Sequence, residues 1–294
     1  MAGATGFVGA RLAAALRESG AEARCLVRGR EKAVRLETEG LEAHVGDVTD
    51  QRSLAGAGRG IEAAYYLVHS MAGGGDFAER ERLGASNFAR MAVREGVERV
   101  VYLGGLGGDD ASEHLRSRNE TARVLSEEGP PLTYFRAAMV VGAGSESYRT
   151  LRYLVGRLPV MIAPAWLQTA TQPIGIDATV EYLRRAPEVA ESAGHEVQIG
   201  GPDVLTYAEM LDRMALAMGK RPRPKLPVPF VTPWLSSLWL GLVTPVDTKV
   251  ARPLVEGLTT ATVVTDASGA APFGIEPEPF DLALRRALEE EARR

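Results

Sequence analysis

The sequence predicts an α/β protein with a doubly wound parallel sheet of the Rossmann type, and three observations support this. A glycine-rich segment, GATGFVG at 3–9, opens the chain. Short apolar runs then alternate with stretches whose apolar residues recur at helical spacing, over about the first 140 residues. The 294 residues are 45% hydrophobic and 24% charged, a composition that allows one substantial core.

The glycine spacing in 3–9 is what a phosphate-binding turn needs. Gly3 permits a tight turn, Gly6 lets backbone amides approach a pyrophosphate, and Gly9 lets the next helix pack closely. That helix starts with its N–H groups and positive dipole end facing the anion. The residues expected to hold a dinucleotide here are Gly3, Thr5, Gly6, Phe7, Val8 and Gly9.

The strand that normally precedes such a loop is absent, since only Met1 and Ala2 come before it. Losing a central parallel strand would expose the edges and apolar faces of its neighbours. We therefore expect the natural chain to start about five to eight residues earlier, given usual strand lengths. The other elements of this part are expected as strands at 23–27, 43–45, 63–68, 99–103 and 133–141 and helices at 7–18, 80–94 and 113–127.

After Gly142 prolines at 159, 164 and 173 interrupt the regular alternation of strand and helix patterns, so we expect two parts. Residues 1–142 form the dinucleotide-binding core, and 143–294 supply the remaining sheet elements and a small substrate-binding or lid region. The second part is expected to contain a helix at 148–158, a strand at 173–177 leading into a helix capped by Asp177, a strand ending at 198–201, a helix at 207–218 with a Thr206–Glu209 capping box, a loop at 221–233, and an amphipathic helix at 280–294.

The segment 233–246 is unusually apolar and includes Trp234 and Trp239. It is too short to span a bilayer. One interpretation is a lid or core helix over a substrate cleft. The other is an apolar surface that contacts a membrane or a lipophilic substrate. The sequence does not determine the oligomeric state.

The net charge and the cysteine and histidine content argue against nucleic-acid binding, an internal disulfide and a metal site. A net charge of -4 argues against a nucleic-acid binder, which would carry a basic excess. The single Cys25 excludes an internal disulfide and, with no secretory signal, fits a cytoplasmic protein. The four histidines lack metal-ligand spacing, so no metal site is expected.

Arg28 stands where an enzyme that prefers NAD usually places Asp or Glu, at the end of the second strand. A guanidinium suits a 2′-phosphate, so the sequence favours NADP, with NAD still possible. The alternative is a solvated residue at a strand end. After the third strand, Asp47 and Val48 are expected to contact adenine, although Asp47 or Asp50 could instead cap a helix.

The end of the fourth strand supplies Val68, His69 and Ser70. Ligands of an open parallel sheet bind beyond the carboxyl ends of the strands, so these residues should lie near the cofactor. His69 is a candidate for chemistry, although a histidine after an apolar strand is also commonly a packed structural residue.

These motifs resemble an atypical, NmrA-like bacterial subgroup of the short-chain dehydrogenase/reductase superfamily. The resemblance covers nearly the whole chain and rests on GATGFVG at 3–9, LVR at 26–28, GDVTD at 46–50, AYYLVHSM at 64–71, YLGGLG at 102–107, LRSR at 115–118, FRAAMVVGAGS at 135–145 and GGPDVLTYAEM at 200–210. It implies a Rossmann domain, a small carboxyl-terminal substrate-binding part and NAD(P) as ligand.

The chain departs from that superfamily at the catalytic positions. Gly104 and Gly105 replace the usual Ser or Thr, and the Tyr-x-x-x-Lys pair becomes His114 and Arg118. These two are four apart and share a helix face. His114 could act as general acid or base, because an ordinary imidazole has a pKa of roughly 6.5. Arg118 could hold ribose hydroxyls or a substrate carbonyl. The alternative is an inactive helix.

The expected function is that of an NADP-dependent oxidoreductase acting on a small, apolar carbonyl or related compound. The cofactor supplies the hydride chemistry, and the protein orients the substrate and supplies a proton. The alternative is an NADP-binding redox sensor or assembly factor without turnover, which the missing Ser, Tyr and Lys favour. A nucleotide-sugar epimerase is less favoured, because it normally uses the absent Tyr-Lys pair.

Overall fold

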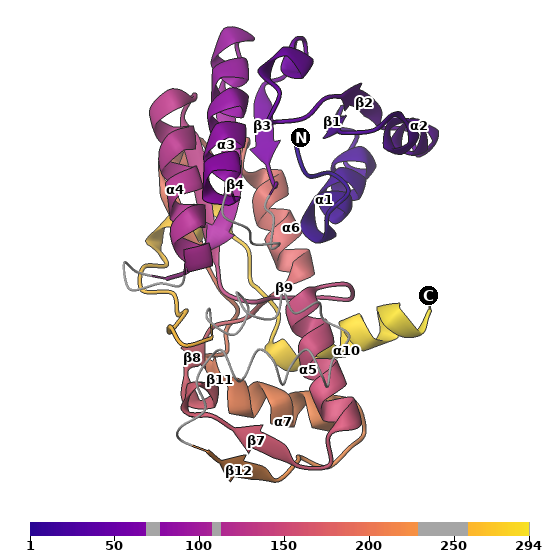
Figure 1. Cartoon of the computed structure of the whole chain (residues 1–294), viewed down its shortest axis with the longest axis vertical. Coiled ribbons are helices and arrows are strands. Elements are labelled where there is room, and N and C mark those ends of the chain that lie inside the picture. The colour runs from indigo at the N-terminus through magenta and orange to yellow at the C-terminus, as the bar shows by residue number, and fades with distance from the viewer. Residues whose placement is uncertain (69–76, 108–112, 229–257, 294) are drawn as a thin grey trace.

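The computed structural model describes residues 1–68, 77–107, 113–228 and 258–293 (Figure 1). Elements alternate as expected for an α/β protein. They are, in order, α1 Phe7–Glu18, β1 Arg24–Val27, α2 Arg30–Thr38, β2 Glu42–Val45, η1 Gln51–Leu54, β3 Ala63–Tyr66, α3 Phe77–Arg94, β4 Arg99–Gly105, α4 Glu113–Glu128, β5 Leu132–Ala137, β6 Val140–Val141, α5 Glu146–Arg157, β7 Met161–Ala163, η2 Ala165–Gln168, β8 Ala170–Thr171, β9 Ile174–Gly175, α6 Ile176–Arg185, η3 Ala190–Ser192, β10 Glu196–Ile199, β11 Leu205–Thr206, α7 Tyr207–Ala217, β12 Lys225–Pro227, η4 Ser268–Phe273 and α10 Phe280–Ala292.

The main sheet is parallel and confirms the predicted Rossmann-type fold. Its strands run in the order β10-β5-β4-β3 on one side of a central gap and β1-β2 on the other. Chain order therefore reverses at that gap, which is where an open α/β sheet places its ligand.

The first two residues bridge the central gap. Ala2 forms parallel bridges with Leu26 of β1 and Tyr66 of β3. Its N–H donates to the Tyr65 carbonyl at 2.8 Å, and its own carbonyl accepts from Leu67 at 3.0 Å. One fully buried residue thus stands where the expected central strand would run.

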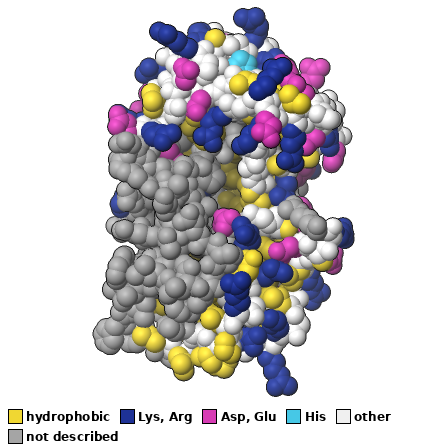
Figure 2. Space-filling model, turned by 45° about the vertical axis from the view of Figure 1, so that its right-hand side comes forward, with side chains coloured by type: hydrophobic (Ala, Val, Ile, Leu, Met, Phe, Trp, Pro, Cys, Tyr) yellow, Lys and Arg dark blue, Asp and Glu magenta, His cyan; other side chains and the backbone are white. Residues whose placement is uncertain are grey.

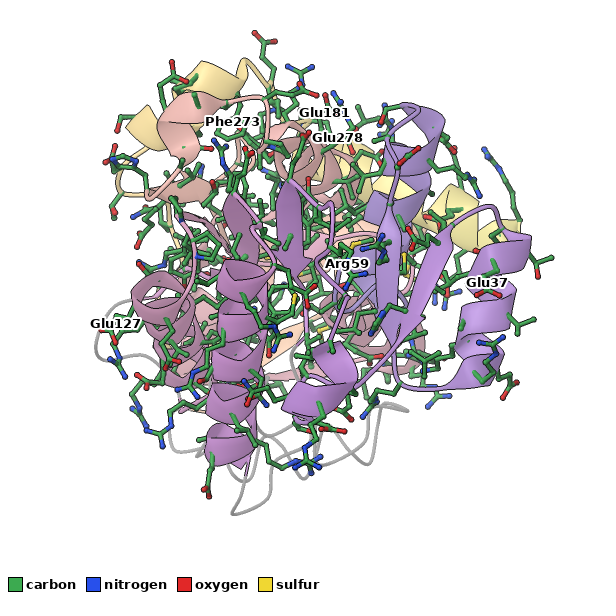
Figure 3. All side chains as sticks on the ribbon, turned by 90° about the horizontal axis from the view of Figure 1, so that it is seen from above. Glu37, Arg59, Glu127, Glu181, Phe273 and Glu278 are labelled. Carbon is green, nitrogen blue, oxygen red and sulfur yellow. The ribbon has the colours of Figure 1, made fainter. Side chains whose placement is uncertain are left out.

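Helices cover both faces of the sheet, and each face has its own core. Figure 3 shows Glu127 of α4 on one side, with Glu181 of α6 and Phe273 on the other. The side of α3 and α4 buries Phe88, Tyr66 and neighbours, whereas the side of α1 and α6 buries Leu12, Phe135 and Phe273 among others. The apolar faces of the sheet are therefore covered, as a parallel sheet requires.

A smaller part, made mainly from α5, α7 and α10, lies at the carboxyl ends of the strands (Figure 1). Its core includes Tyr148, Met210 and Leu284. The helix α10 joins it to α1, because Glu290 pairs with Arg11 of that helix at 2.8 Å. The chain returns from the smaller part to the main sheet, where β10 pairs with β5. The expected division at residue 142 stays a prediction.

Three local expectations are wrong. The strand expected at 133–141 is split into β5 and β6, because the backbone leaves the ladder at Ala138 and Met139. Asp177 does not cap α6; it lies in the first turn, where its carboxylate pairs with Arg286 at 3.0 Å. Within the expected loop at 221–233, residues Lys225–Pro227 form β12, which pairs with β7.

The capping box of α7 is confirmed and generates a stability prediction. Glu209 N–H donates to Thr206 Oγ1 at 3.2 Å, and the Thr206 N–H donates to the Glu209 carboxylate at 2.7 Å. We expect Thr206→Ala to lower the free energy of unfolding by about 1 kcal/mol, measured by urea denaturation. Thr38→Ala is the matched control, because that hydroxyl only bonds back to the Val34 carbonyl within α2. A Thr206→Ala loss no larger than the control's would contradict a capping role.

Candidate functional site

One cavity of about 1030 Å³ lies at the carboxyl ends of the parallel strands, between the sheet and the smaller part. Figure 2 shows the surface hollowed in the middle of the molecule, with hydrophobic side chains inside the hollow. Its lining comes from the loop before α1, the ends of β1, β3, β4 and β5, the first turns of α3 and α5, and one residue of α4.

The glycine-rich loop forms the centre of this cavity. Gly3 has a φ of +87°, a left-handed conformation that strains residues with a side chain. A Cβ on Gly9 would collide with the Gly3 carbonyl, so only glycine permits this close approach of helix and loop. Gly6 precedes α1 without a side-chain cap, which leaves the first N–H groups of the helix for an anion.

One end of the cavity is rich in cations. Arg28, Lys32 and Arg80 line it together with Asp47. Burial raises the pKa of Asp47, but two hydrogen bonds from Thr49 and the charges of Arg28 and Arg80 together hold that pKa below its usual value. Asp47 is therefore an ionised acceptor beside two guanidinium groups at neutral pH.

The β4 and β5 side of the cavity contains Arg118. Leu103, Gly104, Met139 and Val140 line this side, together with the polar residues Ser145, Glu146 and Ser147 at the start of α5. The Nε of Arg118 is buried and finds no hydrogen-bond partner within the described part of the chain. A buried donor without a partner is costly, so it is a candidate contact for a bound molecule.

The structure brings most of the predicted site residues into this single cavity. They are Gly3, Thr5, Gly6, Phe7, Val8, Gly9, Arg28, Asp47, Val48, Val68 and Arg118. His69 and Ser70 lie outside the described residues, as do Trp234 and Trp239. His114 is in the first turn of α4, but its side chain is also outside the description.

Sequence reasoning missed several lining residues from helix starts and loops. Arg80 and Glu81 come from α3, and Ser147 comes from α5. A usable signal existed, because each sits in the first turns of a helix that follows a strand end. Such turns face the ligand in a doubly wound sheet.

The described residues contain no group of three or more His, Cys, Asp or Glu side chains suited to a metal ion. Among the same residues, none of the helices has the length and apolar character needed to cross a membrane.

Comparison with known proteins agrees with this geometry. The segment 3–138 matches the family model described as NAD(P)H-binding. The matched segment supplies the glycine-rich loop, Arg28, Arg80 and Arg118 to the cavity lining. No protein with a curated description matches the sequence significantly.

Solved structures share the fold over nearly the full chain. The triphenylmethane reductase of Citrobacter sp. superposes with a TM-score of 0.77 at 16% identity, covering 98% of each chain. The NADPH-dependent quinone oxidoreductase of Escherichia coli, complexed with NADPH, gives 0.75 at 18% identity over 99% of this chain and 98% of that one. The UDP-glucose 4-epimerase of Thermotoga maritima gives 0.73 at 15% identity over 99% and 97%.

The close approach at Gly9 generates a prediction for cofactor binding. Gly9→Ala forces α1 away from the loop, so we expect NADPH affinity to fall about tenfold or more, measured by fluorescence titration. The matched control is Gly29→Ala, because a Cβ there meets nothing within 4 Å. Circular dichroism should show that both variants fold. Equal affinity of Gly9→Ala and the control would contradict the assigned role of the loop.

Proposed function

We propose that the chain is an NADP-dependent oxidoreductase that acts on a small, apolar carbonyl or related compound. One observation carries this proposal: a single cavity joins the glycine-rich loop and its cations to a region lined by Leu103, Met139 and Val140, where the buried Arg118 Nε has no hydrogen-bond partner among the described residues. The cavity thus offers a place for the dinucleotide and, beyond it, a space for a substrate beside the Arg118 donor.

The cationic end supports NADP over NAD. Arg28 follows β1 directly, Lys32 is one helical turn into α2, and both line the cavity. A carboxylate at position 28 would hydrogen-bond a 2′-hydroxyl and repel a 2′-phosphate, whereas a guanidinium binds the phosphate. The NADPH complex of the quinone oxidoreductase with the same fold is consistent with this choice.

The proposed chemistry divides between cofactor and protein. When bound, the dihydronicotinamide supplies a hydride to the substrate carbon. Arg118 is proposed to orient the carbonyl oxygen or a ribose hydroxyl, since a guanidinium donates without losing its proton. His114, four residues earlier on α4, is proposed to deliver the proton to that oxygen.

A second candidate is an NADP-binding sensor without turnover. Gly104 lines the cavity at the place where the resemblance leads one to expect a hydroxyl side chain, and this observation favours it. The two candidates differ in one measurement, which is NADPH oxidation in the presence of quinones and aldehydes or ketones. No oxidation with any acceptor, despite tight NADPH binding, would favour the sensor.

The cofactor preference is testable at Arg28. We expect Arg28→Ala to weaken NADPH binding by about 10- to 100-fold, the value of a charge-assisted hydrogen bond, and to leave NADH binding nearly unchanged. Arg30→Ala is the control, because Arg30 is exposed and is not among the cavity-lining residues. Tighter binding of NADH than NADPH by the natural sequence would overturn the preference.

The proton donor is testable at His114. We expect His114→Ala to lower NADPH-dependent turnover by about 10²- to 10⁴-fold with NADPH affinity retained. Carbonyl reduction places a proton on the substrate oxygen, so removal of the imidazole should slow turnover and leave cofactor binding unchanged. His195→Ala, outside the cavity lining, serves as control. Unchanged turnover in His114→Ala would exclude this residue.

A further inference from the structure

Tyr134 occupies the space that a side chain at position 104 would need. A Cβ built on Gly104 would lie 2.6 Å from both Cε2 and the hydroxyl oxygen of Tyr134. Tyr134 stands on β5, the strand beside β4, opposite Tyr102. A residue larger than glycine at 104 and a tyrosine ring at 134 therefore exclude each other. The absence of a side chain at position 104 is therefore required by the presence of the Tyr134 ring.

The Tyr134 hydroxyl is bonded to the helix that carries Arg118. It donates to Oδ1 of Asn119 at 3.0 Å, and Asn119 follows Arg118 on α4. The rings of Tyr102 and Tyr134 stack at 5.4 Å, and the Tyr102 hydroxyl donates to the Arg118 carbonyl at 3.4 Å. Two hydroxyl groups from adjacent strands thus hold α4 at consecutive residues.

The close packing of α4 on the end of β4 also sets where the Arg118 guanidinium lies. A Cβ on Gly105 would collide with Leu115 of α4 and lie 3.8 Å from Nη1 of Arg118. Two glycines at the end of β4 therefore let α4 approach the strand closely, and Tyr134 fills the room beside them. Burial raises the pKa of the Tyr134 hydroxyl to about 12, so the group remains a donor at physiological pH.

We propose that Tyr134 is a positioning residue that substitutes for the hydroxyl side chain missing at Gly104 and, through Asn119, holds Arg118 at the ligand end of the cavity. Tyr134 does not line the cavity itself, so it acts through α4. This inference rests on the proposed function only for the assignment of Arg118 to the bound ligand.

The first test removes the hydroxyl and keeps the ring. Tyr134→Phe is expected to weaken NADPH binding about five- to tenfold, and to have no further effect when Arg118 is already replaced by Gln. Tyr65→Phe is the matched control: it removes a buried hydroxyl that donates to the Leu183 carbonyl at 3.1 Å on the other face of the sheet. The control should lose comparable thermal stability and keep its NADPH affinity.

The second test adds a hydroxyl side chain at position 104 and shortens the side chain at position 134. Gly104→Ser alone is expected to lower the melting temperature, because the serine meets the ring. Tyr134→Leu shortens that side chain, so the double variant Gly104→Ser with Tyr134→Leu should recover melting temperature relative to Gly104→Ser. It should also recover NADPH affinity relative to Tyr134→Leu, since the hydroxyl is restored. If the changes in melting temperature and NADPH affinity of the two single variants simply add in the double variant, the proposal is wrong.

The outcomes separate this inference from the proposed function. Normal affinity in Tyr134→Phe, or an equal loss in the Arg118→Gln background, rejects Tyr134 as the positioning residue even if turnover is found. A loss of NADPH affinity in Tyr134→Phe that disappears in the Arg118→Gln background supports the positioning role of Tyr134. If the natural sequence also shows no NADPH oxidation with any acceptor, the oxidoreductase proposal is rejected while the role of Tyr134 stands. A chain that binds neither NADPH nor NADH rejects both.

Discussion

The cofactor site depends on one close backbone approach, in which the Gly3 carbonyl lies where the Cβ of residue 9 would be. This contact fixes the start of α1 directly against the loop, so the first N–H groups of the helix face the cavity. One turn later, Arg11 donates to the Ala143 carbonyl at 2.7 Å and pairs with Glu290 of α10. The helix whose first N–H groups face the cavity therefore also contacts the smaller part through Arg11.

The parallel sheet explains why the site has two unlike ends. All strands point their carboxyl ends at the same edge, and the chain order reverses at Ala2. Segments on the β1 side bring Arg28 and Lys32, whereas segments on the β4 side bring Arg118 and apolar residues. The glycine-rich loop and Arg118 thus come from different sides of the sheet. This arrangement allows the loop to keep its glycine spacing while α4 carries His114 and Arg118 in place of the Tyr and Lys that the resemblance leads one to expect.

The sequence at the end of β4 and the position of α4 are coupled to core packing. The ring of Tyr134 occupies the space that a side chain at position 104 would need, and Leu115 occupies the corresponding space at position 105. Because protein interiors are close-packed, neither glycine can change alone. The stacked pair Tyr102 and Tyr134 belongs to the buried cluster beneath α3 and α4, so the position of Arg118 is set by that core.

The sequence alone determined the features that depend on near neighbours in the chain. The glycine spacing at 3–9, the cation at 28 and the capping box at Thr206 are local, and periodicity located most helices because burial of one face follows a 3.6-residue repeat. Only the tertiary structure decided which distant residues share the cavity, such as Arg80 and Ser147. It alone showed what fills the space beside Gly104, because strand register places Tyr134, 30 residues away, against it. Contacts across a sheet depend on pairing between strands, and no local pattern in one strand encodes its neighbour.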